Sequence, residues 1–257
     1  MNMMAKFMQD DSIPGIESPA QLRQTLRDLP PVQLERMNAA ADEILECYRV
    51  LKKGGANIVG EILRGEGTFY EWDHYPEGDI YDNETHAQYY YHAHREGEHG
   101  HFHTFLRKKG MREDVTPVPY HGDAEWPTAE DEVICHLIAI SMDSAGFPIS
   151  LFTTNRWVTG ENWYDKADVI GMLDGFVIDH STPSWPVNRW LSAMLVLFRP
   201  QIEQLVVARD AKIAEWQSDN PDTDVFEVRE LEVTSTLDIR VEDQIRAVKE
   251  VIEGRLD

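Results

Sequence analysis

The sequence predicts an α+β fold in which an antiparallel β-sheet, open or partly closed into a barrel, is flanked by helices from both ends of the chain. Apolar residues recur at helical spacing over residues 32–53 and 186–217. Between these segments, stretches rich in β-branched and aromatic residues alternate with turn signals. The last two stretches are joined only by residues 143–146, which favours an antiparallel meander over parallel strands with crossover helices.

Start and stop signals delimit the predicted helices. Ser18 followed by Pro19 is typical of a helix start, and Gly54 is typical of a helix end. Pro200 is expected to break or kink the long helical segment near the C-terminus. The predicted helices cover residues 18–28, 32–53, 164–175, 186–217 and 241–253.

The predicted strands cover residues 57–63, 68–72, the two arms of a hairpin within 88–106, 133–142, 148–157 and 227–233. We predict that residues 1–257 form a single domain. Its parts are N-terminal helices in residues 1–55, a β core in 56–160 and a mainly helical part in 161–257.

The net charge of the chain limits which kinds of partner it is expected to bind. The chain has 24 basic and 46 acidic residues, a formal net charge of −22 that repels phosphate backbones and anionic lipids. We therefore expect a small-molecule substrate and neither a nucleic-acid nor a membrane partner. Cys47 and Cys135 lack metal-binding spacing and are expected to be free thiols. The first residues do not form a signal peptide, and no apolar run has the length of a membrane span, so we expect a cytoplasmic protein.

Residues 88–106 contain five of the ten histidines, four of them in two His-x-His pairs around a turn. Residues two apart in a strand point to the same face, so His92 shares a face with His94, and His101 with His103. The other face is mostly apolar and suited to a core. The histidines are therefore expected on the polar side of the sheet. The apolar face comprises Ala87, Tyr89, Tyr91, Ala93, Phe102, Thr104 and Leu106.

The turn sets which histidines oppose each other. Gly97 and Glu98 fit a two-residue type II′ turn, which favours glycine at its first central position. A longer turn centred on residues 98–100 would change the opposed pairs but keep each His-x-His pair together. The short turn predicts that His94 lies opposite His101 and His92 opposite His103.

This arrangement predicts a metal site. Opposed side chains of an antiparallel pair have Cβ atoms roughly 4.5–5.5 Å apart, which lets two imidazoles share an ion. A neighbouring rung can add a third ligand and leave a fourth position open, as in three-histidine zinc sites. Imidazole ligands suit iron, copper or zinc. The predicted ligands are His92, His94, His101 and His103, with His99 and His136 as additional ones. The alternatives are a solvated histidine face and, for His136, a core position within an apolar strand.

Three charged residues accompany the histidines as predicted catalytic groups. Glu96 and Glu98 lie in or beside the turn, where either could complete the metal shell, orient a histidine or accept a proton. The alternative is that both are solvated. Arg156, at the end of a predicted strand, could bind a substrate carboxylate or phosphate. For this region the alternative is a turn whose tryptophans pack over the core.

The segment from His92 to Glu98 also resembles the first metal-binding motif of the cupin family, His-x-His followed after three or four residues by Glu. The resemblance covers seven residues. It implies a small β-barrel whose metal, often iron or manganese, is held by His92, His94, Glu98 and a later histidine.

These patterns favour a metal-dependent enzyme, with an oxidoreductase or oxygenase ahead of a hydrolase. A histidine-bound iron or copper ion with open positions can bind oxygen, whereas zinc would generate a hydroxide nucleophile. Two other interpretations remain: a carrier or sensor that binds metal or haem without turnover, and an interaction protein with a pH-responsive histidine face.

Overall fold

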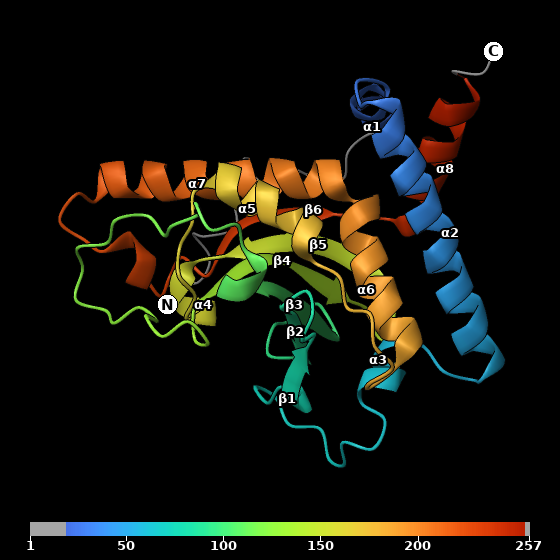
Figure 1. Ribbon diagram of the computed structural model, residues 1–257, viewed down its shortest axis with the longest axis horizontal. Coiled ribbons are helices and arrows are strands. Elements are labelled where there is room, and N and C mark those ends of the chain that lie inside the picture. Colours follow the sequence, from blue (N-terminus) through green and yellow to red (C-terminus); the bar gives the residue numbers. More distant parts are fainter. Residues whose placement is uncertain (1–18, 255–257) are drawn as a thin grey trace, which may run out of the picture.

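One antiparallel sheet of six strands forms the middle of the protein, and the helices lie around it (Figure 1). The computed structural model describes residues 19–254. The strands follow one another across the sheet in chain order, so the sheet is a meander, and it is open rather than closed into a barrel. This confirms the predicted α+β class. The strands are β1 (Tyr75–Tyr81), β2 (Ala87–His92), β3 (Gly100–Arg107), β4 (Ile134–Met142), β5 (Pro148–Thr154) and β6 (Val233–Asp238).

The helices come from both ends of the chain, as predicted. The start predicted at Ser18 lies outside the described residues, and α2 ends at its C-cap, Gly54. Short 3-10 turns add η2 (Lys108–Gly110), η3 (Leu173–Gly175) and η4 (Val225–Glu227). The α-helices within residues 19–254 are α1 (Pro19–Arg27), α2 (Pro31–Lys53), α3 (Ile58–Ile62), α4 (Arg156–Thr159), α5 (Lys166–Met172), α6 (Trp185–Leu197), α7 (Arg199–Asp219) and α8 (Val241–Glu253).

Helix α6 lies between the sheet and α2 (Figure 1). The fully buried ring of Trp190 on α6 is 5.9 Å from the ring of Phe102 on β3 and 6.4 Å from that of Tyr48 on α2, measured between centroids. The hydroxyl of Tyr89 on β2 donates a 2.6 Å hydrogen bond to Asn188 Oδ1 on α6. The core therefore extends from one face of the sheet through α6 to α2.

The hairpin face predicted to be apolar packs into this core. Tyr89, Tyr91, Phe102 and Leu106 are all buried, and the shorter Thr104 is buried with them. Burying each large side chain contributes about 1.5–3 kcal/mol, which fixes which face of β2 and β3 turns toward α6. The prediction of the core face is confirmed, and the histidines consequently point to the other side of the sheet.

Three predicted strands are wrong or displaced. Residues 57–63 form α3, because the Asn57 side chain caps the helix by accepting a 2.7 Å hydrogen bond from Gly60 N. Residues 68–72 form no strand, and β1 begins only at Tyr75. The last strand starts at Val233, because Asp224 caps the 3-10 turn η4 and the chain reaches the sheet edge later than predicted.

The break expected at Pro200 is present. Helices α6 and α7 are separate and meet at an angle of 72°. Within residues 19–254, no single helix has the length and apolar character needed to cross a membrane. Taken together, α6 and α7 have that length and composition, but they are bent at the break between them.

Candidate metal centre

Strands β2 and β3 pair with His92 opposite His101. The predicted pairs, His94 with His101 and His92 with His103, are wrong by two residues because the strands are joined by residues 93–99 rather than by a two-residue turn. A shift of two keeps every side chain on its predicted face. Gly100 fixes the observed register, since a β-carbon there would overlap the Tyr91 ring and the carbonyl oxygen of His92.

The histidine face is covered rather than solvated, which corrects the prediction that it is the polar side of the sheet. His92, His101, His103 and His136 are all buried, and His94 is half-buried. Aromatic rings account for part of the cover. The ring of Phe152 on β5 lies 5.2 Å from that of His101, between centroids.

Three imidazoles converge on one point. His92, His94 and His101 each offer a nitrogen, and these three atoms lie within 4.8 Å of one another. The Nε2 atoms of His92 and His101 are 2.7 Å apart. Tetrahedral zinc with Zn–N bonds of 2.0–2.1 Å would hold its nitrogens about 3.3 Å apart. The two Nε2 atoms therefore need to move apart by only about 0.6 Å to bind an ion between them. The arrangement can therefore bind a transition metal and leave a coordination position open.

Glu98 orients one of these ligands. Its carboxylate accepts a hydrogen bond from His101 Nδ1, which leaves His101 Nε2 for a metal. Burial pushes the pKa of Glu98 upward. That effect is outweighed, and the pKa of Glu98 lies below its usual value. The lowering comes from the hydrogen bond and charge of His101, from the Ser141 hydroxyl and from the charge of Arg95. Glu98 is therefore a carboxylate placed behind one of the three converging imidazoles, an arrangement that fits one of the roles predicted for it.

Burial holds the ligands in the form that a metal requires. Burial first, and then the neighbouring imidazoles, lower the pKa of His92 to about 2. The same two causes lower the pKa of His94. Both rings are therefore neutral near pH 7, and metal binding displaces no proton from them.

Residues outside the hairpin complete the surroundings of the three histidines. The exposed Trp72 ring stacks on His94 with centroids 4.2 Å apart, and the Trp72 backbone has φ 75°. Left-handed backbone is unusual for so bulky a residue. It is held here by stacking and by a 3.2 Å hydrogen bond from Trp72 N to the Ala93 carbonyl. Strained positions of this kind occur often at functional sites.

His74 was not among the predicted site residues. Its ring stacks on Tyr90 at 3.6 Å and lies edge-on to His92 at 5.6 Å, between centroids. Its Nδ1 is 3.0 Å from Asp79 Oδ1, so a second carboxylate and histidine pair stands beside the three ligands. A signal was present in the sequence, a histidine five residues before an aspartate, but it lies away from the His-x-His pairs.

His74 also borders a hollow of about 860 Å³. Of the site's histidines, His74 is the one that lines this hollow in the described part of the chain, and His92, His94 and His101 do not reach it. It is lined by Glu66, Thr68, Tyr70, Asp73, His74, Tyr75, Glu77, Gly78 and Asp79.

His103 and His136, predicted as ligands, form a separate pair. His103 Nδ1 is 3.0 Å from His136 Nε2, and within residues 19–254 the other nitrogen of His103 has no hydrogen-bond partner. Burial lowers the pKa of His136 to about 3. Glu161 accepts a 2.6 Å hydrogen bond from the His136 backbone N–H, and burial raises the pKa of Glu161 to about 7. Neither histidine joins the group of three.

The other predicted residues lie elsewhere. His99 is exposed, and its Nδ1 is 2.8 Å from the Tyr91 hydroxyl; Glu96 is also exposed. Arg156 is buried and donates to Glu227 Oε1 at 2.5 Å and to the Glu161 carbonyl at 3.0 Å. This placement fits the structural alternative for Arg156, and its role toward a substrate stays a prediction.

Comparison with known proteins places the chain in a family without assigning a chemistry. The family model described as "Domain of unknown function (DUF6969)" matches residues 38–239, a span that includes α6, the whole sheet and all three converging histidines. No curated protein and no solved structure matches the chain. The cupin resemblance does not extend to the fold, because the sheet is open and Glu98 bonds to His101 instead of joining the three converging nitrogens.

Proposed function

We propose that this chain, which belongs to the DUF6969 family, is a metal-dependent enzyme whose ion is bound by His92, His94 and His101. The convergence of these three nitrogens within 4.8 Å carries the proposal. Three protein ligands leave at least one coordination position for water, oxygen or substrate, which separates catalytic from structural sites. Three imidazole ligands suit iron(II), copper or zinc.

Redox chemistry on a small substrate is favoured over hydrolysis. A hydrolytic metal site commonly uses a carboxylate as the base that takes a proton from water. Glu98, the carboxylate nearest the ligands, is largely buried and already held by His101, with Arg95 Nη1 3.8 Å away. An iron or copper ion at this site would supply electron transfer and oxygen binding.

The protein's own groups would position the substrate. His74, on the border of the 860 Å³ hollow, stands between that hollow and His92. Asp79 holds the His74 ring through Nδ1 and leaves Nε2 to contact a bound molecule. Trp72 covers His94 and excludes water from that side of the ligands.

Metal content tests the first part of the proposal. The untagged protein, its His92→Ala and His94→Ala variants, and a His121→Ala control are purified and analysed for bound metals. His121 is exposed and outside the site, so it controls for the loss of a histidine. Wild-type and control are expected to hold about one ion per chain and the two site variants almost none. Equal, negligible metal in all four, with no binding on reconstitution, rejects the proposal.

Nitric oxide separates an enzyme from a carrier. Iron(II)-loaded protein is exposed anaerobically to nitric oxide, which binds at an open coordination position and gives a characteristic paramagnetic resonance signal. The signal is expected in the wild-type and absent in His92→Ala. A protein that holds iron but gives no signal has a closed shell, which would make it a carrier or sensor. Oxygen uptake with a panel of small molecules then identifies the substrate.

A further inference from the structure

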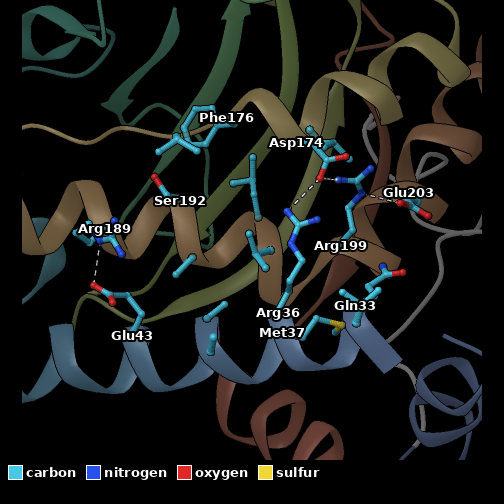
Figure 2. A pocket seen from close by; sticks show the side chains of 18 of the residues that line it. Gln33, Arg36, Met37, Glu43, Asp174, Phe176, Arg189, Ser192, Arg199 and Glu203 are labelled. Atoms are coloured by element: carbon cyan, nitrogen blue, oxygen red, sulfur yellow. Dashed lines mark hydrogen bonds and ion pairs between the residues drawn. The ribbon is translucent and has the colours of Figure 1, made fainter. Parts of the chain in front are cut away.

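A second cavity lies on the helical side of the sheet, away from the histidines. It occupies about 580 Å³ between α2 and α6 and is closed at one side by η3 and the first turn of α7 (Figure 2). This volume is in the range of small-molecule sites, roughly 300–1,000 Å³. The sheet separates the cavity from His92, His94 and His101, so binding in the cavity is independent of the proposed metal.

Small side chains create the cavity, and apolar ones form its floor. Ala39 and Ala40 on α2 and Ser192 and Ala193 on α6 line it, so two helices that are in contact elsewhere leave a gap here. The floor is closed by buried apolar groups, which are Met37, Leu173, Phe176 and Leu195. Such a floor stabilises an apolar body of similar size by removing the apolar surface of both from water.

Arginines stand at both ends of this floor (Figure 2). At one end, Arg189 Nε donates to Glu43 at 3.1 Å. At the other, Arg199 is fully engaged, through Nε to Glu203 at 2.6 Å, Nη1 to Asp174 at 3.0 Å and Nη2 to the Ile170 carbonyl at 2.7 Å. Among the residues that the structure describes, no lysine lines the cavity.

Arg36 has fewer partners than these two arginines, since Arg189 also has Asp179 3.8 Å from its Nη1 and lies over the Trp185 ring. Within residues 19–254 its guanidinium makes one hydrogen bond, from Nη2 to Asp174 Oδ1 at 3.3 Å, although the group has five N–H donors. Its side chain is 59% exposed and reaches from α2 over the cavity toward Asp174 (Figure 2). Asp174 keeps Arg199 as a partner if Arg36 turns away, so Arg36 can accept another carboxylate without leaving an unpaired charge.

We propose that this cavity binds a monocarboxylate with an apolar body. The carboxylate pairs with the free edge of the Arg36 guanidinium, whose planar fork matches it in two parallel hydrogen bonds. The apolar body lies on the floor between α2 and α6. A cationic head group is disfavoured there, because each carboxylate of the described chain that lines the cavity, Glu43, Asp174 and Glu203, is already paired with an arginine.

Three probes with the same ten-carbon chain test the proposal: decanoate, decanol and decyltrimethylammonium, each titrated calorimetrically below its micelle concentration. We expect decanoate to bind about tenfold more tightly than decanol, and the cation to bind more weakly than either. The Arg36→Gln variant should bind decanoate about as weakly as decanol and leave decanol unchanged. Arg112→Gln, at an equally exposed arginine outside the cavity, should behave as the wild-type.

A filling variant and the oligomeric state complete the test. Ala39→Leu places a larger side chain in the cavity from an exposed position, so the variant should still fold. It should bind both decanoate and decanol more weakly than the wild-type does. The proposal is overturned if decanoate and decanol bind the wild-type equally or not at all, or if Arg36→Gln leaves decanoate binding unchanged. It is also overturned if light scattering shows a dimer that Ala39→Leu dissociates, because a second copy would then cover the cavity.

Discussion

Two pairs of histidines lie side by side on one face of the sheet, and they differ in what stands around them. His92 and His101 approach through Nε2 atoms 2.7 Å apart, and His103 and His136 through Nδ1 and Nε2 at 3.0 Å. All four side chains are buried. The first pair has a third imidazole, His94, and a carboxylate behind one ring. In the described part of the chain, neither member of the second pair belongs to this group of three, although the His103 ring lies 4.8 Å from the His101 ring between centroids. The carboxylate of Glu161 bonds to the His136 backbone N–H rather than to a ring.

Aromatic rings pack against the second pair, as Phe152 does against His101 in the first. The ring of Phe105 lies 5.3 Å from that of His136, and the ring of Phe152 lies 6.1 Å from that of His103, between centroids. The second pair offers two facing imidazoles, and a metal-binding role for His103 and His136 stays a prediction. A third donor and a carboxylate that fixes the ring orientation are what distinguish the first pair.

The largest expected effect is loss of a ligand. His101→Ala leaves two donors, so the affinity for zinc or iron(II) should fall by more than roughly 100-fold, beyond the effect of losing an outer-shell partner. His103→Ala, one rung away on the same strand, should keep the affinity within about threefold, since it removes no donor. Competition with a chromophoric chelator measures both. Similar losses in the two variants would mean that the pairs share one site.

The second-largest loss of metal affinity is expected for Glu98→Gln. Glutamine can still accept the hydrogen bond from His101 but lacks the charge that makes the ring a better ligand, so affinity should fall about 10–100-fold. Glu96 is exposed, so Glu96→Gln is the matched control and should leave the metal affinity unchanged. The same chelator competition applies. A loss as large as that of His101→Ala would instead make Glu98 a ligand itself.

Acid stability tests whether His136 of the second pair is held neutral by burial. The pKa of His136 is about 3 in the folded protein and near 6.5 when unfolded, so between these values only the unfolded chain binds the proton. Stability is therefore full above pH 6.5 and falls as pH decreases, by about 1.4 kcal/mol per pH unit for this group. Between pH 6.5 and 5, the metal-free wild-type should lose about 2 kcal/mol more than His136→Gln. Urea unfolding at both pH values measures the difference. Parallel pH curves would show that His136 is not held neutral.

The smallest effect is expected at the edge of the first pair. Trp72→Ala removes the ring stacked on His94 and should weaken metal binding about threefold, as expected for one stacking contact. Trp185, which is also exposed but far along the chain on α6, provides the control Trp185→Ala. An unchanged affinity in Trp72→Ala would show that Trp72 does not position His94.

The local pattern of the sequence determined which residues share a face. Alternation along residues 87–106 assigned Tyr89 and Tyr91 to the core and the histidines of the two His-x-His pairs to the other side, because side chains in a strand alternate whatever the register. Capping and proline signals likewise determined the ends of α2 and the break between α6 and α7. A short apolar run such as residues 57–63 could not be assigned in this way, since helix and strand look alike at that length.

Tertiary structure alone decided how the histidines group. The opposition of His92 to His101 depends on Gly100 fitting against Tyr91, a contact between two strands that no local pattern encodes. The arrival of Trp72 and His74 beside the hairpin depends on how the chain before β1 returns to the sheet. Metal coordination needs donors placed within a few ångströms in three dimensions. Periodicity specifies direction from the backbone, but only packing between distant segments sets those distances.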